Sequence, residues 1–216
     1  MAFDAYDDYE QSERVQKWLR QNGLSIGVGI AIGLVAIFGW QQWGNHKTAH
    51  QAQAAELYKQ IQDYRAAGLD SNASALIAQL QQDYADTTYA IFAASDNAQQ
   101  LVRAKQLDKA QVSLDWAQSH AADPTLKALT ALRSAQVQLA RNKANDALAT
   151  LDSIPAGSFA GLAQELRGDV LVKLGRLDDA RKAYQTAVTA LGKDAPQGGA
   201  LQMKIDDLAV AGKQGA

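Results

Sequence analysis

Cysteine is absent from this chain of 216 residues, and histidine occurs only three times. Without cysteine the chain has no disulfide framework, no thiolate metal site and no thiol nucleophile. His46 and His50 lie four residues apart, as two metal ligands on one helix would. Neither a third ligand nor a neighbouring glutamate follows them. We therefore expect no metal site there.

Catalytic motifs are also missing. The sequence contains no nucleophile elbow, no phosphate-binding loop and no cluster of metal ligands. The remaining histidine, His120, has nothing beside it that marks it as a general base. We expect a protein without catalytic activity and without a cofactor.

An excess of positive charge is lacking as well. Residues 1–20 hold five acidic and three basic side chains, and the rest of the chain holds 18 of each. The formal net charge of -2 therefore comes from the N-terminal leader alone. Because the larger part is neutral and has no basic patch, we do not expect a nucleic acid as partner.

One long apolar run is present, from Leu24 to Trp43, and no charged residue occurs between Arg20 and Lys47. Twenty helical residues span about 30 Å, the thickness of the hydrocarbon core of a bilayer. A buried helix of a soluble protein would need a polar face, and residues 26–40 have none. We therefore predict a transmembrane helix over 24–43.

The flanks of this run predict its orientation. Three basic residues precede it closely and one follows it, so the N-terminus is expected in the cytoplasm. Trp18, Trp40 and Trp43 suit the two membrane interfaces. A cleaved signal peptide would need a short basic start and a small-residue cleavage site, whereas this chain has a polar leader over 1–23. We predict an uncleaved anchor and an outer domain over 44–211.

Small residues recur every four positions in the predicted span, at Ser25, Gly29 and Gly33. This spacing allows a second membrane helix to approach closely. Glycine is also common in membrane helices for other reasons, so a helix partner remains one of two interpretations.

Three segments of the outer domain resemble one another, near 91–124, 128–160 and 161–193. Each segment has one small residue on each of its two predicted helices. A capping residue lies two positions before the second small residue, and a bulky residue lies four positions after it. A period near 34 residues with two helices per unit predicts an all-α solenoid of helical hairpins. The aligned positions are Ala98, Ala135 and Gly168; Ala110, Ala147 and Ala180; the caps Asp108, Asn145 and Asp178; and the bulky Leu114, Leu151 and Tyr184.

The third segment, LRGDVLVKLGRLDDARKAYQTAV, resembles the tetratricopeptide repeat family. In the other two segments Lys105 and Asn142 replace the turn glycine, so altered crossing angles are expected there. A bundle of long helices without repeats is the alternative. A final amphipathic helix over 199–211, with Leu201, Ile205 and Leu208 facing inward, is expected to cap the stack.

The tetratricopeptide resemblance also implies a binding surface, because the first helix of each hairpin lines the concave face in that family. The set mixes apolar and amide groups with few charges, which suits an extended or partly unfolded polypeptide. Leu132 and Leu162 fit this face and packing between hairpins equally well. The predicted groove residues are Phe92, Gln99, Arg103, Leu129, Gln136, Glu165, Asp169 and Lys173.

Over its whole length the chain looks like the YfgM family of bacterial inner-membrane proteins, mainly through TLKALTALRSAQVQLARNKANDALATLDSIP and the third segment. The resemblance implies an ancillary subunit of the SecYEG translocon with a periplasmic domain. It would work beside a membrane-anchored, PpiD-like periplasmic chaperone and pass unfolded or nascent polypeptides to soluble chaperones. The leader of such proteins is also implicated in restraining a cytoplasmic response regulator.

Two alternatives stay open. The chain could be a membrane tether that modulates a cytoplasmic stress-response regulator through its leader, or an envelope assembly scaffold. Deletion of residues 2–13 separates the tether from the translocon role, because only the tether needs the leader. Copurification would reveal a scaffold.

Overall fold

The computed structural model describes the backbone of residues 4–155, 157, 159–192 and 195–214. Side chains are described from residue 14 to residue 209 within those ranges, so the acidic side chains of the predicted leader lie outside them. The described chain is helical, without a strand, and the predicted all-α fold is confirmed. It forms two compact units, Met1–Ala52 and Gln53–Ala216, which we describe separately.

The first unit consists of the N-terminal part of helix α1 (Asp4–Ala66). Its apolar side chains lie on the surface all round the helix; Leu24, Val35 and Phe38 are 72–85% exposed. A soluble core helix would bury such a face, and this segment buries nothing inside the chain. It is the one helix among the described residues that is long and apolar enough to cross a membrane.

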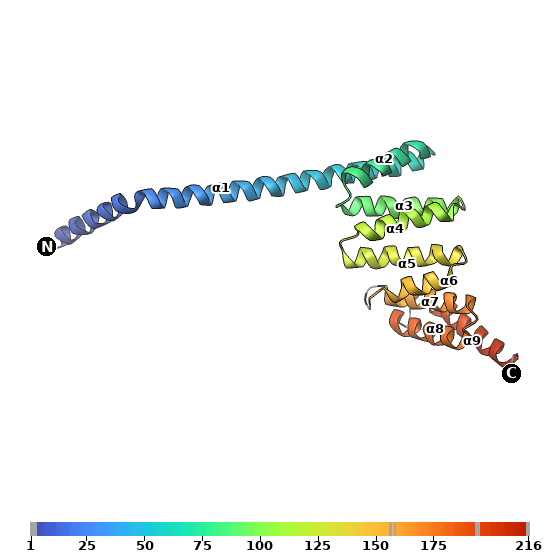
Figure 1. Cartoon of the computed structure of the whole chain (residues 1–216). Helices are drawn as coiled ribbons and strands as arrows, with labels where there is room; N and C mark the ends of the chain where they lie inside the picture. Colours follow the sequence, from blue (N-terminus) through green and yellow to red (C-terminus); the bar gives the residue numbers. More distant parts are fainter. Residues whose placement is uncertain (1–3, 156, 158, 193–194, 215–216) are drawn as a thin grey trace. The chain divides into compact units, whose positions relative to one another are not determined.

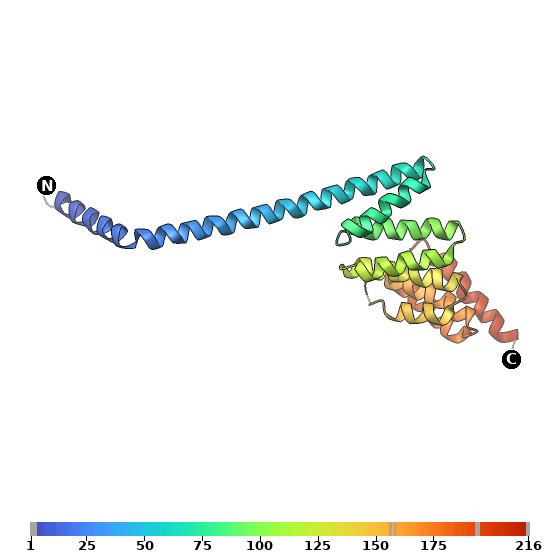
Figure 2. The ribbon, with the colours of Figure 1, turned by 45° about the horizontal axis from the view of Figure 1, so that its top comes forward.

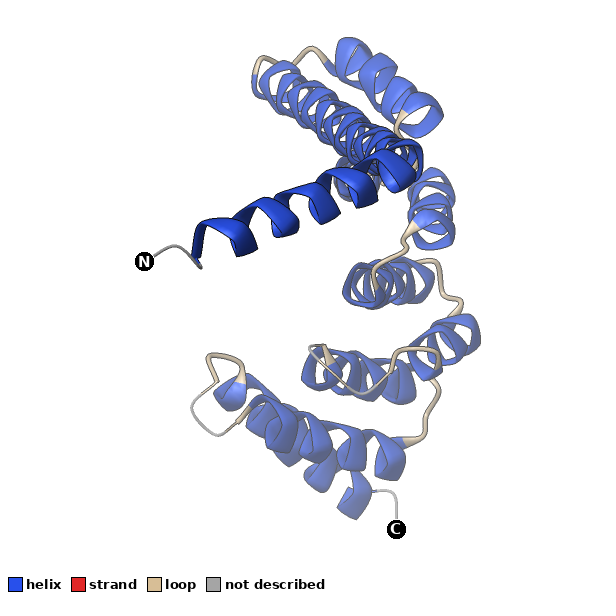
Figure 3. Ribbon diagram, turned by 90° about the vertical axis from the view of Figure 1, so that its left-hand side faces the viewer, coloured by secondary structure: helices blue, strands red, loops and turns tan. Residues whose placement is uncertain are grey.

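The second unit is a stack of helical hairpins (Figure 1). From α2 onward each helix contacts the next along the chain. Helices α3 to α8 follow one another in layers in Figure 1, and Figure 3 shows the stacked helices from another side. The helices after α1 are α2 (Asp70–Asp83), α3 (Thr88–Arg103), α4 (Leu107–His120), α5 (Pro124–Ala140), α6 (Ala144–Asp152), α7 (Ala160–Lys173), α8 (Leu177–Leu191) and α9 (Gly198–Gln214).

The turn inside each hairpin has the same backbone conformation. Gly68, Lys105, Asn142 and Gly175 all have positive φ, between 57° and 74°. In each turn the amide after this residue donates to a carbonyl five residues back, as Gln106 does to Leu101. This is a Schellman-type helix end, which favours glycine in the left-handed position. Lys105 and Asn142 therefore adopt the same turn conformation as the two glycines, and the altered crossing angles of their hairpins stay a prediction.

Counted from these turn residues, the four hairpins share one register. The fifth residue after the turn is a buried alanine and the ninth is a buried bulky side chain. The alanines are Ala73, Ala110, Ala147 and Ala180, and the bulky residues are Ile77, Leu114, Leu151 and Tyr184.

The first of these hairpins, the end of α1 with α2, was not among the three predicted repeats. We call the first helix of each hairpin its inner helix and the second its outer helix. The inner helix of the first hairpin carries Ile61 seven residues before the turn, where the later hairpins carry Ala98, Ala135 and Gly168. Ile61 is fully buried, so this hairpin is spaced by a large side chain in place of a small one. That difference hid the repeat from the sequence pattern.

The predicted capping residues are wrong. Asp108, Asn145 and Asp178 lie in the first turn of α4, α6 and α8, whereas the N-cap residues are Gln106, Lys143 and Arg176, without a side-chain cap bond. Because the preceding left-handed turn already fixes the chain direction, these helices begin without a capping side chain. An aspartate in the first turn still favours the helix through the helix dipole.

Side-chain caps occur at two of the three connections between hairpins; the N-cap residue of α7, Phe159, makes no such bond. Asp123 Oδ1 accepts the backbone amides of Thr125 and Leu126 at 2.8 and 2.9 Å, and Pro124 opens α5. Thr87 caps α3 by accepting the amide of Ala90. These two caps start the inner helices of the second and third hairpins.

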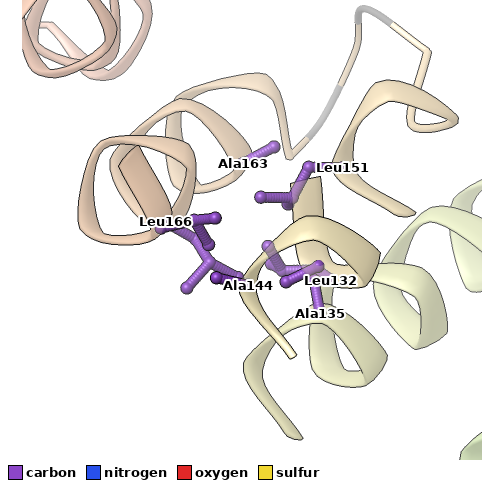
Figure 4. Close-up of a cluster of buried hydrophobic side chains, with 8 residues drawn as sticks. Leu132, Ala135, Ala144, Leu151, Ala163 and Leu166 are labelled. Carbon is purple, nitrogen blue, oxygen red and sulfur yellow. The ribbon is translucent and has the colours of Figure 1, made fainter. Parts of the chain in front are cut away.

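The core is divided into clusters that join neighbouring hairpins. Figure 4 shows the cluster between α5, α6 and α7, where aliphatic side chains from the three helices point toward one another. Leu132 and Leu166 are buried there, and Leu162 is partly buried against them. Leu132 thus packs between hairpins.

Helix α9 closes the end of the stack beside α8 (Figure 2). Leu201 is fully buried, Leu208 is 7% exposed, and Ile205 packs against the same cluster as Tyr184 and Ala187. Arg181 Nη2 also donates to the carbonyl oxygen of Leu208 at 2.9 Å. This helix buries the face of the last hairpin that has no further repeat to cover it.

Candidate protein-binding site

The first helices of successive hairpins pack side by side, since α3 contacts α5 and α5 contacts α7. Between α3 and α5 lies a pocket of about 270 Å³. Helix α3 contributes its last two turns, α5 its second half, and α4 one buried side chain. The pocket is lined by Ser95, Ala98, Gln99, Val102, Leu114, Arg133, Gln136, Val137 and Ala140.

Gln99 and Gln136, two of the predicted groove residues, meet at this pocket. Both side chains are exposed, and neither amide makes a hydrogen bond to the part of the chain that the structure describes. Some other glutamines of the stack are bonded within the chain; Gln138, for example, accepts a bond from Thr150. The two amides at the pocket can therefore bind a ligand without breaking an internal bond.

The cationic group of the pocket is Arg133, whose guanidinium lies 4.0 Å from Asp96 of α3. Asp96 also accepts hydrogen bonds from the Tyr58 hydroxyl, at 2.6 Å, and from the Gln62 amide, at 3.1 Å. Burial of the ring and the bond to Asp96 raise the pKa of Tyr58 to about 12. This network ties the end of α1 to α3 and offsets the charge of Arg133.

Two of the three predicted groove residues of α7, Glu165 and Asp169, bind helix α9. Lys204 Nζ donates to Glu165 Oε1 at 3.1 Å and to Asp169 Oδ1 at 2.8 Å. Asp169 also accepts the Tyr184 hydroxyl at 2.7 Å. The pKa of Tyr184 is raised by burial and by this bond. Burial alone would lower the pKa of Lys204, but the hydrogen bonds and charges of Asp169 and Glu165 together raise it. Glu165 and Asp169 therefore bind the capping helix within the chain.

The other predicted groove residues lie outside the pocket lining. Phe92 and Leu129 are half-buried, and the Phe92 ring lies 6.2 Å from that of Tyr58. Arg103 and Lys173 are exposed in the last turns of α3 and α7.

Sequence reasoning missed Leu114, which forms part of the pocket from the second helix, and Arg133. Leu114 is one of the aligned bulky residues of the repeat pattern, and that alignment was the only sign that it matters. Arg133 gave no signal, because a single arginine on a helix resembles any solvated charge.

In the first unit, Ser25, Gly29 and Gly33 lie along one side of α1, and a Cβ atom added at either glycine would meet no other atom of the chain. Trp40 and Trp43 are exposed and form an edge-to-face pair with ring centres 6.2 Å apart. Trp18, also exposed, precedes Trp40 by about 33 Å of helix. That spacing matches two interfaces of one bilayer.

Among the described residues no group of three or more histidine and carboxylate side chains could hold a metal ion. The stack has an open pocket bordered by the side-chain amides of Gln99 and Gln136 and lined mainly by aliphatic side chains. Such a surface can bind polypeptide by hydrogen bonds and side-chain packing.

Comparison with known proteins gives matches over almost the whole chain. A model of the tetratricopeptide repeat-like domain matches residues 16–210. The ancillary SecYEG translocon subunit of Escherichia coli K12 is 30% identical over 204 residues, which cover 94% of this chain and 98% of that protein. The proteins of the same name from Haemophilus influenzae and Neisseria gonorrhoeae are 30% and 26% identical, covering 87% and 94% of this chain and 91% and 97% of their own lengths. The chain therefore belongs to the family of ancillary SecYEG translocon subunits with a tetratricopeptide repeat-like domain, the YfgM family.

Proposed function

We propose that this protein is an ancillary subunit of the SecYEG translocon that binds polypeptides as they leave the channel. The observation that carries the proposal is the match to translocon subunits along nearly the full length of both proteins. The apolar segment of α1 supplies an anchor, and the stack supplies a surface that can hold a protein segment.

A membrane anchor that holds the repeat domain beside the channel would let even weak contacts with emerging polypeptides be effective. A domain held beside the channel meets each emerging chain at a high effective concentration, so affinity for any one segment can stay low. Low affinity allows fast release, and release is needed if the segment is to reach another chaperone. We propose that the acceptors include a membrane-anchored, PpiD-like chaperone and soluble periplasmic chaperones.

We further propose that the N-terminus is cytoplasmic and that the repeat domain is periplasmic. The basic residues Arg14, Lys17 and Arg20 before the apolar segment, against Lys47 after it, support this orientation, and the exposed tryptophans at its two ends support a membrane span.

Site-specific photocrosslinking in intact cells tests the function. A photoreactive residue at Gln99 or Gln136 should capture translocon components or newly exported chains. Gln185 is a matched control, since it is an exposed glutamine on the outer helix α8. Capture of neither partner from the pocket positions, or equal capture from Gln185, contradicts the proposal.

A further inference from the structure

The shared register of the hairpins places four polar residues in one row on the inner helices. Each lies six positions before the turn residue of its hairpin, which is Gly68, Lys105, Asn142 or Gly175. The row consists of Gln62, Gln99, Gln136 and Asp169.

Both ends of this row are closed by bonds within the chain. Gln62 donates to Asp96 Oδ2, and Asp169 accepts the Lys204 ammonium and the Tyr184 hydroxyl. Only Gln99 and Gln136, in the middle, are left with free amides among these four, and they border the same pocket. The open part of the row therefore spans two hairpins.

We infer that Gln99 and Gln136 bind the backbone of a neutral, extended polypeptide segment while the pocket between them takes one aliphatic side chain. A glutamine side chain offers both a donor and an acceptor, as a peptide unit requires. Packed helices lie about 8–10 Å apart and an extended chain advances about 3.3 Å per residue, so the two amides reach peptide units about three residues apart.

The lining of the pocket specifies the rest of the segment. Its floor of Ala98, Val102, Leu114 and Val137 is aliphatic, and its volume of about 270 Å³ suits one side chain with the adjoining backbone. The Arg133 guanidinium lies near Asp96, which offsets its attraction for a carboxylate. The site therefore selects internal segments, with no preference for a chain terminus or an acidic motif.

This inference rests on the proposed function, because an unfolded segment must reach the domain. Its test uses the full chain in detergent micelles and a short labelled peptide of glycine, serine and threonine with one central leucine, acetylated and amidated at its ends. The double variant Gln99→Ala/Gln136→Ala should bind this peptide about tenfold more weakly, from the loss of two hydrogen bonds. Gln185→Ala should bind it as the unchanged protein does.

Backbone methylation of the peptide isolates the hydrogen bonds. N-methyl groups on the residues flanking the leucine should weaken binding to the unchanged protein by a similar factor and should have little further effect on the double variant. Undiminished binding of the methylated peptide overturns the inference. So does a tenfold gain in affinity when the peptide ends in a free carboxylate.

Copurification separates this inference from the proposed function. The double variant should still copurify with SecYEG, because the pocket is not the anchor. If copurification holds while the peptide results fail, the backbone inference is wrong and the translocon role stands. If the unchanged protein does not copurify, the proposed function itself fails.

Discussion

At the scale of single residues, side chains of complementary size set the distance between the two helices of a hairpin. In the last hairpin Gly168 faces Tyr184, and a Cβ atom at position 168 would overlap the tyrosine ring. In the two hairpins before it, an alanine at the equivalent position goes with a leucine: Ala98 with Leu114, and Ala135 with Leu151. Glycine is thus required where the bulky partner is aromatic.

We expect Gly168→Ala to destabilise the domain by about 1–3 kcal/mol, the usual cost of overpacking a core. Thermal unfolding followed by circular dichroism measures the change. Gly199→Ala is the matched control, because nothing lies within 4 Å of a Cβ at that helical position and alanine favours helix. A loss at position 199 equal to that at position 168 would show that the tyrosine contact is not the cause.

The left-handed turn residues give a second expectation. Lys105 adopts φ 57°, which costs a residue with a Cβ about 1–2 kcal/mol, whereas asparagine tolerates this conformation. Lys105→Gly should therefore stabilise the domain by up to about 1 kcal/mol, and Asn142→Gly should change it little. Gly175→Ala should destabilise it by about 1 kcal/mol or more. Denaturant titration ranks the three variants, and the reverse order for Lys105 and Gly175 would contradict the account.

Tyr58 makes stability depend on pH in the alkaline range. Its pKa is raised to about 12 from the ordinary value of 10, so the folded state favours the protonated hydroxyl that donates to Asp96. The resulting stability is complete below about pH 10 and is lost as the pH rises through about 12. Tyr58→Phe should flatten the decline in unfolding free energy above pH 10. An unchanged slope would exclude this residue as its source.

At the scale of elements, repetition made the fold predictable. The positions that recur about every 34 residues are the ones that contact a neighbouring helix, so the sequence alone predicted a stack of helical hairpins. The first hairpin was not recognised as a repeat, because Ile61 stands where the later hairpins have a small residue. Two ion pairs, Asp96 with Arg133 and Asp169 with Lys204, join residues that are 37 and 35 positions apart in the sequence. No local sequence pattern predicts such pairs.

The capping helix α9 should contribute to stability mainly through its buried leucines. Leu201 is fully buried against the last hairpin, so Leu201→Ala should cost about 2–5 kcal/mol. Met203, on the same helix and 69% exposed, should tolerate the same change within about 0.5 kcal/mol. Equal effects in thermal unfolding would mean that α9 does not cover the stack as the structure has it.

For the whole molecule, the sequence predicted the candidate anchor and the repeat fold, while the binding role of Gln99 and Gln136, which border the pocket, stays a prediction. It could not tell that Glu165 and Asp169 bind Lys204, because the capping helix and α7 lie far apart along the chain. The open site is consequently smaller than the predicted groove.

Orientation is a property of the whole chain as well. We expect a reporter fused after residue 216 to be active only if it functions in the periplasm, since the basic residues precede the apolar segment. A reporter active in the cytoplasm at that position would place the repeat domain on the wrong side of the membrane for exported chains.

Affinity purification of the full chain in a mild detergent tests the central claim most directly. We expect SecYEG subunits to be recovered with it by mass spectrometry, and to be lost when residues 14–46, which include the predicted anchor, are removed. Recovery of other membrane proteins without any SecYEG subunit would contradict the assignment of this protein to the translocon.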